Sequence, residues 1–192
     1  LGVGLGFVLS HFSGFEKHGL DLSKEYVEVA KRIVPTAKLY IQSMHNFKIP
    51  EKFDVIFSVH ECINEVKPFK NWESTFEHAY KHLSDKGLFI FDMRTLKHLE
   101  DKKKQIVRLE KTPTGYIYDN TIVNGNKLIW DTTYFKKVSG DLYKIEKDSY
   151  DEIVFPVEKV KKSLSRRFHV LETIFIEDKT RAMFICIKKR LK

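Results

Sequence analysis

The chain opens on alternating glycines, Gly2, Gly4 and Gly6, and an acidic residue, Asp21, follows the last of them by fifteen positions. Glycines carry no Cβ, so they let backbone N–H groups come close to a ligand. Asp21 ends the segment 15–21, which we interpret as a strand. A carboxylate at the end of such a strand can accept hydrogen bonds from both hydroxyls of a ribose. The glycine turn, the strand and the acid together predict a nucleotide-like cofactor in a parallel α/β fold.

The first half of the chain, residues 1–98, alternates short apolar runs with segments of helical period. This alternation is typical of a parallel sheet covered by helices. We expect strands at 15–21, 38–41, 53–58 and 88–92, a turn at 85–87, and helices at 23–33 and 72–83. The face that the helix 23–33 should bury carries Tyr26, Val29, Ala30 and Ile33.

No strand precedes the glycine run, although such a loop normally follows one. In a doubly wound sheet that strand is central, so without it the sheet would divide and leave backbone donors and acceptors unpaired. We therefore expect the natural protein to have further residues before Leu1.

The pattern changes from about residue 116. Strands are predicted at 116–123, 127–136 and 142–153, and they are joined by Asn-Gly and Ser-Gly turns that indicate an antiparallel meander. A short helix beginning at Pro156 and a hairpin, 169–177 with 181–188, complete the chain. We interpret residues 1–192 as a single domain in which a meander at about 115–153 is inserted and covers the active site.

Composition favours one globular domain, because 192 residues with 42% hydrophobic content are enough to bury a core. The net charge of +8 raises the question of nucleic acid, but the lysines are spread among acids and form no aromatic-interleaved stripe. No apolar run approaches the roughly 20 residues that span a bilayer, so we predict no membrane partner. Two distant cysteines, Cys62 and Cys186, indicate no metal site and favour a reducing, cytoplasmic compartment.

At this point the chain resembles the class I S-adenosylmethionine-dependent methyltransferases. The glycine run resembles the end of that family's glycine motif, and residues 18–23 resemble the second-strand motif that carries the ribose-binding acid. Residues 53–58 resemble the fourth-strand motif, and residues 83–92 the turn and fifth strand. The closing hairpin supplies the antiparallel last strand that separates this fold from nicotinamide-binding relatives. The resemblance implies a Rossmann-like doubly wound sheet with an antiparallel last strand and an inserted β-meander.

The resemblance also implies a cofactor, S-adenosylmethionine, and a set of residues that hold it. Asp21 would bind the ribose, and Leu22 would pack near the adenine. Ser43 stands where the family usually has an acid that accepts from the adenine amino group, whereas Met44 can still stack on the ring. The implied cofactor-binding residues are Gly2, Gly4, Gly6, Asp21, Leu22, Ser43, Met44 and Ser58.

His60 and Glu61 are the titratable pair best placed on this topology, at the carboxyl end of the strand 53–58, and we predict them as catalytic residues. A histidine at this place could take a proton near neutral pH. The alternative is structural: His60 bonds the backbone and Glu61 faces solvent. For Cys62 we favour a small buried thiol over a nucleophile.

Substrate contacts could also come from two further groups of residues. Asp92 and Arg94 end the strand 88–92, where a plain salt bridge is an equally good interpretation. Trp130, Asp131 and Tyr134 lie in the meander, but side chains alternate along a strand, so only one set can face inward.

The leading hypothesis is an enzyme that moves a methyl group from S-adenosylmethionine to an N or O atom of a small molecule. An RNA or protein methyltransferase is the first alternative, motivated by the positive charge. A nicotinamide-dependent oxidoreductase is the second, although Phe7 occupies the position of its third glycine. A cofactor-binding module without activity is the third, supported by Ser43. The sequence does not indicate the oligomeric state.

Overall fold

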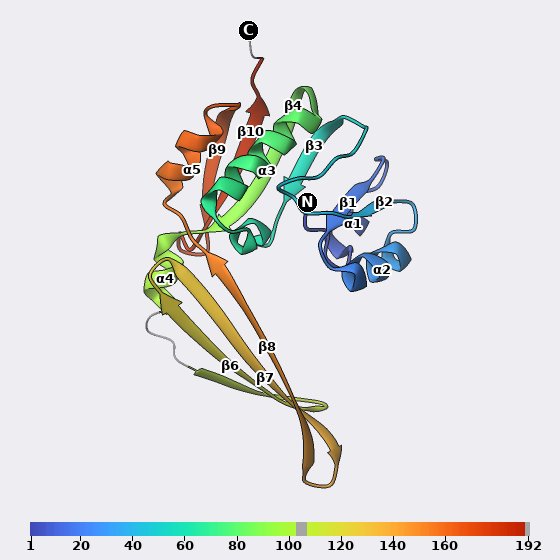
Figure 1. Cartoon of the computed structure of the whole chain (residues 1–192), viewed down its shortest axis with the longest axis vertical. Helices are drawn as coiled ribbons and strands as arrows, with labels where there is room; N and C mark the ends of the chain where they lie inside the picture. The colour runs from blue at the N-terminus through green and yellow to red at the C-terminus, as the bar shows by residue number, and fades with distance from the viewer. Residues whose placement is uncertain (103–106, 191–192) are drawn as a thin grey trace.

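A computed structural model describes residues 1–102 and 107–190. Figure 1 shows an α/β body from which a long antiparallel ribbon of strands extends. In chain order the elements are α1 (Phe7–Ser10), β1 (His18–Asp21), α2 (Lys24–Ile33), β2 (Lys38–Ile41), β3 (Phe53–Ser58), η1 (Cys62–Glu65), α3 (Phe69–His82), β4 (Leu83–Arg94), α4 (Leu96–Lys102), β5 (Val107–Thr112), β6 (Gly115–Asn124), β7 (Lys127–Ser139), β8 (Leu142–Ile153), α5 (Val157–Leu164), β9 (Phe168–Ile176) and β10 (Arg181–Lys188).

The larger sheet of the body has the strand order β3-β4-β10-β9. β3 and β4 run parallel, whereas β10 pairs antiparallel with both β4 and β9. The hairpin β9–β10 therefore places its second strand between β4 and β9. The antiparallel last strand that the sequence predicts is confirmed.

The strands of the body form two separate sheets. β1 and β2 form a separate parallel pair that is not hydrogen-bonded to β3. The first residues of the chain lie between the two parts. The Leu1 ammonium donates to the Phe57 carbonyl at 2.7 Å, and the Val3 N–H donates to the Leu20 carbonyl at 2.8 Å. The glycine loop is thereby held between β1 and β3.

The helix α2 buries only part of the predicted face: Ala30 is buried as expected, Val29 and Ile33 are half-buried, and Tyr26 is exposed. Val27, Ala30 and Val34 are buried, whereas Tyr26 is 51% exposed and points toward a cavity described below. The Ser23 hydroxyl caps the helix by accepting from the Tyr26 N–H, which fixes the start of the helix one residue after the cap. The preceding strand is shorter than predicted, because it begins at His18 and leaves Phe15 exposed.

The core lies between α3 and the larger sheet. Trp72, Phe76 and Ala79 form the buried stripe of α3, as the helical spacing predicts, and they pack with Phe89 and Phe91 of β4. The predicted turn at 85–87 becomes an irregularity within β4, where pairing with β3 jumps from Leu83 to Leu88. Lys86 adopts a left-handed backbone conformation within this unpaired segment.

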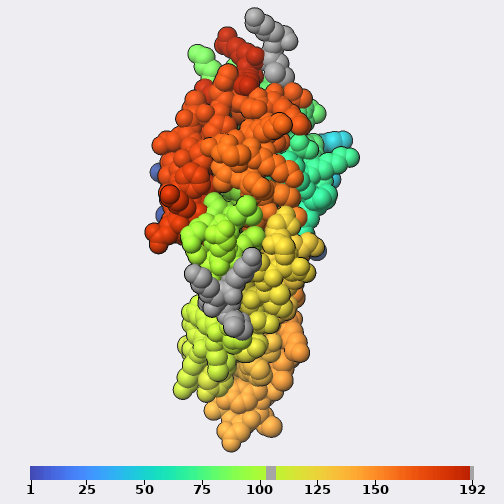
Figure 2. All heavy atoms as spheres, turned by 90° about the vertical axis from the view of Figure 1, so that its left-hand side faces the viewer, coloured from blue at the N-terminus to red at the C-terminus, as the bar shows by residue number. Residues whose placement is uncertain are grey.

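The meander has one strand more than the sequence predicts, because β5 precedes the three expected strands and pairs with β6. Figure 2 shows that it forms a lobe below the body. Its base is anchored by α4, where Leu99 packs with the buried Leu128 and Val154. No periodic pattern in the sequence predicts α4, which is 7 residues long.

Candidate active site

The glycine loop and the strand-end acid meet directly. The Gly4 N–H donates to Asp21 Oδ2 at 2.8 Å, and the Ser23 N–H donates to Asp21 Oδ1 at 3.0 Å. Asp21 is half-buried and lies at the carboxyl end of β1. The carboxylate is thus oriented by two backbone amides at the rim of the loop, where a ribose hydroxyl can reach it.

The glycines of the loop have different surroundings. Gly4 has a φ of +52°, and a Cβ placed there would meet no atom within 4 Å, so the space above it is open to a ligand. Gly6 precedes α1 with a φ of +89°, and a Cβ there would lie 3.1 Å from the Cβ of Ala30. Gly4 therefore gives access, while Gly6 permits close packing against α2.

A cavity of about 370 Å³ opens beside this loop, and we call it the cofactor pocket. It lies between the β1–β2 pair and the segment that follows β3. It is lined by Gly2, Gly4, Leu20, Asp21, Leu22, Tyr26, Gln42, Ser43, Met44, His45, Cys62, Glu65, Val66, Lys67 and Asn71. Most of the predicted cofactor-binding residues are therefore brought together here; Gly6 and Ser58 are not among the lining residues.

The two residues predicted to lie against the adenine, Leu22 and Met44, both line the cofactor pocket. Leu22 is 70% exposed and presents an apolar surface, while Met44 is largely buried beneath the pocket. Between them, Ser43 Oγ and His45 Nδ1 lie 2.6 Å apart. The sequence did not single out His45, which supplies a polar group next to the position where the resemblance expects an acid.

Ser58 lies elsewhere. It is buried at the end of β3, and its hydroxyl has no hydrogen-bond partner among the described residues. Its predicted role in cofactor binding stays a prediction.

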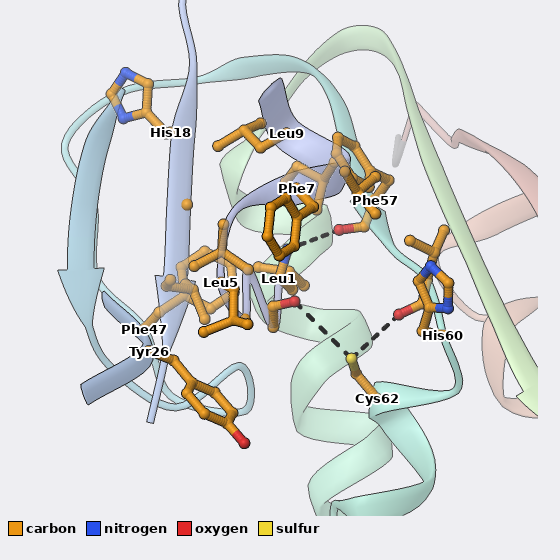
Figure 3. Close-up of a pocket in the computed structure, with 18 of the residues that line it drawn as sticks. Leu1, Leu5, Phe7, Leu9, His18, Tyr26, Phe47, Phe57, His60 and Cys62 are labelled. Carbon is orange, nitrogen blue, oxygen red and sulfur yellow. Dashed lines mark hydrogen bonds between the residues drawn. The ribbon is translucent and has the colours of Figure 1, made fainter. Parts of the chain in front are cut away.

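A larger, apolar cavity of about 410 Å³ lies between β1 and β3 (Figure 3). Leu5, Phe7, Leu9 and Phe57 are among the side chains that line it. This cavity occupies the gap between the two parts of the sheet and does not contain Asp21. The residues predicted to make polar contacts with a cofactor, Asp21 and Ser43, line the smaller cavity instead.

His60 and Glu61 form a left-handed turn after β3, with φ values of 61° and 54°. The buried carboxylate of Asp92 fixes this turn by accepting from the Glu61 N–H at 2.8 Å and from the His60 N–H at 3.3 Å. The His60 side chain is exposed at the rim of the apolar cavity. Neither His60 nor Glu61 lines the cofactor pocket.

The Glu61 side chain belongs to a buried ion-pair network. Its carboxylate pairs with Arg181 of β10 and lies 3.8 Å from Arg94 of β4. Arg181 also pairs with Asp92, and Arg94 pairs with Glu152 of β8 at 2.5 Å. Of the two interpretations open for Asp92 and Arg94, the structure shows ion pairs, although not with each other.

Cys62 begins η1 beneath the glycine loop, where its thiol donates to the Val59 carbonyl at 3.1 Å (Figure 3). Burial raises the pKa of this thiol to about 12, so it is protonated at neutral pH. A protonated thiol is a poor nucleophile, which agrees with the interpretation as a small buried group.

Glu65 is the acidic residue that η1 turns toward the cofactor pocket, and the sequence reasoning missed it. Its carboxylate has no hydrogen bond or ion pair with other described residues. Partial burial raises the pKa of Glu65, and the nearby carboxylates of Glu152 and Asp21 raise it further, against an opposing effect of Lys67. The fully buried Asn64 holds η1 in place by donating to the Ile153 carbonyl at 2.8 Å and accepting from the Arg94 N–H at 3.0 Å.

The base of the meander forms a wall next to η1. Trp130 and Tyr150 stack at 6.1 Å with their rings 13° apart, and the Arg94 guanidinium lies over the Trp130 ring at 5.7 Å. Burial raises the pKa of Tyr150 to about 12, and the neighbouring Glu152 adds to the shift. Trp130 thus faces the body and α4, whereas Asp131 lies on the opposite face of β7.

The fold and this site together define a class of protein: an α/β domain with a cavity beside a glycine loop and a strand-end acid. The methyltransferase domain family matches residues 1–87. No curated protein matches the chain by sequence.

Solved structures match nearly the whole chain. A S-adenosylmethionine-dependent methyltransferase from Clostridium acetobutylicum has a TM-score of 0.87 at 19% identity, and the match covers 97% of this chain and 81% of that one. The amino pentose methyltransferase CalS10 from Micromonospora echinaspora, solved with S-adenosylmethionine bound, has a TM-score of 0.79 at 14% identity over 98% of this chain and 81% of that one. The sugar N-methyltransferase KedS8 from Streptoalloteichus has a TM-score of 0.82 at 14% identity over 98% and 78%.

The structural likenesses show the fold, and the family match over residues 1–87 includes the residues that line the cofactor pocket. The chain therefore has the fold of the S-adenosylmethionine-dependent methyltransferases, and its first 87 residues resemble their methyltransferase domain. The predicted family, the Rossmann-like fold and the prediction of an enzyme that uses S-adenosylmethionine are thereby confirmed.

Among the described residues, 1–102 and 107–190, none of the helices is both long and apolar enough to cross a membrane. In the same ranges no three histidine, cysteine or acidic side chains gather in a way that could hold a metal ion.

Proposed function

We propose that the protein transfers the methyl group of S-adenosylmethionine to an amino nitrogen of a small molecule. The observation that carries this proposal is a shared cavity: the open loop at Gly4, the oriented carboxylate of Asp21 and the unpaired carboxylate of Glu65 all border the cofactor pocket. The glycines and Asp21 hold the cofactor, and Glu65 lies on the side that η1 and the meander close.

The cofactor fits the residues that are present. Asp21 can bind both ribose hydroxyls, the space above Gly4 admits a chain lying against the loop, and Leu22 with Met44 can enclose a flat base. When bound, S-adenosylmethionine supplies a methyl group already activated by a positively charged sulfonium. What remains for the protein is to align the acceptor, exclude water and manage one proton.

A nitrogen acceptor is favoured over an oxygen acceptor by the charges near η1. The carboxylate of Glu65 forms no ion pair with the described residues, whereas Glu152 is paired with Arg94, and an unpaired carboxylate attracts an ammonium. A protonated amine must lose one proton before its nitrogen can attack. A carboxylate with a raised pKa is a stronger base than an ordinary carboxylate, so it accepts that proton more readily. In this proposal Glu65 takes the proton from the acceptor and releases it to solvent.

The predicted catalytic pair takes different roles in this proposal. Glu61 acts by position, because its ion pairs with Arg181 and Arg94 fix the turn that leads into η1. His60 stays a candidate proton acceptor only for a group that reaches the rim of the apolar cavity. The free thiols of Cys62 and Cys186 fit a reducing cytoplasm, which is the compartment we propose.

Calorimetry with S-adenosylhomocysteine and with NAD tests the cofactor assignment. We expect S-adenosylhomocysteine to bind and NAD not to bind. Asp21→Ala should raise the Kd for S-adenosylhomocysteine by about 5- to 150-fold, because a hydrogen-bonding acid worth roughly 1–3 kcal/mol is lost. Asp85→Ala, which removes an exposed acid in β4, is the matched control and should leave the Kd unchanged. Unchanged affinity in Asp21→Ala would remove the ribose role, and binding of NAD alone would favour the oxidoreductase alternative.

The acceptor class is tested by methyl transfer from radiolabelled S-adenosylmethionine to paired small molecules. Each pair should share one carbon skeleton and carry either an amine or a hydroxyl at the same position, with RNA and a protein mixture as further acceptors. We expect transfer to the amines. Preferred transfer to hydroxyls, RNA or protein would overturn this part of the proposal while leaving the cofactor assignment intact.

A further inference from the structure

The helix α3 presents a row of polar side chains to the loop that joins β2 to β3. Ser74, His78 and His82 follow one another at intervals of four residues, so they lie on one face of the helix. We call these three residues the polar stripe of α3. All three are half-buried, so their polar groups need partners within the protein.

The polar stripe binds the backbone of every second residue along the loop. Its three hydrogen bonds join the Ser74 hydroxyl to the His45 carbonyl at 2.6 Å, His78 Nδ1 to the Phe47 carbonyl at 2.8 Å, and His82 Nε2 to the Ile49 N–H at 3.2 Å. The first two stripe residues donate to carbonyls, whereas the third accepts from an N–H. The loop segment 43–49 is therefore held along the helix by side chains that match its backbone one by one.

The third contact fixes the protonation of the His82 ring. Because the Ile49 N–H donates to Nε2, this nitrogen carries a lone pair and no proton. The other ring nitrogen, Nδ1, lies 2.7 Å from the His78 carbonyl, which can only accept, so Nδ1 carries the proton. His82 is thus neutral when both bonds are made. A second proton would go to Nε2, where it would meet the Ile49 N–H and break the contact.

The loop segment 43–49 connects the polar stripe to the cofactor pocket. The ring of Phe47 is buried and its centroid lies 4.4 Å from that of the His82 ring. Phe47 and Ile49 form one apolar cluster with Leu20 and Met44, and the last two line the cofactor pocket. Since β1 and β2 are not hydrogen-bonded to β3, the polar stripe adds a tie between this side of the pocket and the rest of the body.

We infer that the polar stripe of α3 holds the loop segment 43–49 in the position that binds S-adenosylmethionine, and that protonation of His82 releases this segment. His82 is a positioning residue, because it acts through the loop and does not line the cofactor pocket. A released segment must be ordered again when the cofactor binds, and this ordering opposes binding. Affinity therefore falls as the pH is lowered through the range in which histidine titrates. The inference rests on the proposed binding of S-adenosylmethionine in the cofactor pocket.

Other titratable groups lie near His82. Burial lowers the pKa of His78, but a protonated His78 would still donate from Nδ1 to the Phe47 carbonyl, so its titration leaves the polar stripe intact. The charged groups that contact the last turn of α3 or the first residues of β4 are Lys52, Asp54, Glu77, Lys81 and Lys188. Lysine and carboxylate side chains ordinarily keep their charge between about pH 6 and 8, whereas histidine does not. A change of affinity over this range therefore reports a histidine.

Calorimetry with S-adenosylhomocysteine between about pH 5.5 and 8 tests the inference. We expect the Kd of the unsubstituted chain to rise by about 3- to 10-fold toward the acidic end, as for the loss of one hydrogen bond. His82→Leu should show the higher Kd at every pH. His82→Gln should keep the lower Kd without the pH dependence, because a glutamine oxygen can accept from the Ile49 N–H and does not titrate. His169→Leu, which removes an exposed histidine of β9, is the matched control and should preserve both the Kd and its pH dependence.

Two further variants separate the possible outcomes. His45→Gln removes the histidine that lines the cofactor pocket and, whatever its own Kd, should keep the pH dependence. A pH dependence that survives in His82→Gln, that His45→Gln removes, or that the unsubstituted chain lacks would overturn the inference. Binding that Asp21→Ala weakens and His82→Leu does not would overturn the inference alone. No binding to the unsubstituted chain at any pH would overturn the proposed cofactor pocket as well.

Nitrogen-15 NMR of the imidazole rings reads the state of His82 directly in the unsubstituted, folded chain. At neutral pH we expect a neutral His82 ring with its proton on Nδ1 and a lone pair on Nε2. His82→Gln assigns the signal by removing it, and circular dichroism checks that each variant is folded. A His82 ring that carries a proton on Nε2 at neutral pH would overturn the inference, even if His82→Leu failed to fold.

Discussion

Glu65 forms no ion pair with the described residues, and this determines how the site should respond to pH. Partial burial and the carboxylates of Glu152 and Asp21 raise the pKa of Glu65, so its proton-accepting form appears at a higher pH than for an ordinary glutamate. If Glu65 accepts the proton of the amine, kcat/KM rises with pH through the raised pKa of Glu65 in the free enzyme.

We predict that Glu65→Gln removes this limb of the pH profile and lowers kcat/KM for an amine acceptor by about 10²- to 10⁴-fold at neutral pH, the usual contribution of a general base. The measurement is kcat/KM against pH with one acceptor at saturating S-adenosylmethionine. Glu73→Gln, on the far side of α3 beside Arg166, is the control for loss of a carboxylate. A variant at position 65 that keeps both the rate and the pH dependence would eliminate Glu65 as the proton acceptor.

The carboxylate that we propose as proton acceptor differs from the one that the sequence favoured. A strand-end position favoured Glu61, since groups at the carboxyl ends of parallel strands face the ligand crevice. The left-handed turn at His60 and Glu61 instead sends the Glu61 side chain toward Arg181, and one further turn of η1 brings Glu65 to the pocket. No local pattern encodes that turn, because its partner Asp92 lies some 30 residues away in sequence. Asp21 and the glycines were predictable because their contacts are local to one strand–loop–helix unit.

Among the elements, β10 contributes Arg181, whose ion pairs stabilise the turn before η1. Arg181 is 16% exposed at its side chain and pairs with the fully buried Asp92 as well as with Glu61. Removing one partner of a buried ion pair leaves an uncompensated charge, which typically costs about 3–5 kcal/mol.

We predict that Arg181→Met lowers the free energy of unfolding by about 3–5 kcal/mol in urea denaturation. The double variant Arg181→Met with Asp92→Asn should be less destabilised than the sum of the two single variants, because the unpaired charge is then absent. Arg166→Met is the control, since the Arg166 side chain is 65% exposed in its pair with Glu73 and should cost about 1 kcal/mol or less. Additive effects of Arg181→Met and Asp92→Asn would show that the pair is not coupled.

Elements with a strong periodic spacing of apolar residues were predicted well, whereas short elements were not. α3 and the hairpin β9–β10 appear where helical spacing and alternation placed them. α1 has only 4 residues and η1 is held by Asn64, so both owe their shape to tertiary contacts that a single sequence window does not contain. For α2 the period was right but the buried face only in part, because Tyr26 turns to the cofactor pocket rather than the core.

At the scale of the whole molecule, the cofactor pocket spans the division in the sheet. Asp21 and Ser43 belong to the part built from β1, β2 and α2, whereas Glu65 and Asn71 belong to the part that contains the larger sheet. The glycine loop connects the parts through two backbone hydrogen bonds, from Leu1 and from Val3. A ligand in this pocket therefore contacts both parts at once.

This geometry predicts how the chain responds to S-adenosylhomocysteine in hydrogen exchange. Without ligand, amides of β1 and β2 should exchange faster than those of β4 and β10, because a two-stranded pair with few contacts opens at lower free energy than the centre of a four-stranded sheet. Ligand at 100 times its Kd stabilises the folded state by about 2.7 kcal/mol, so exchange in β1, β2 and α2 should slow most. Asp21→Ala should abolish this protection at the same ligand concentration, while Asp85→Ala should preserve it. Uniform protection of β1 and β10 would mean that the two parts open together, and protection confined to the meander would place the ligand outside the cofactor pocket.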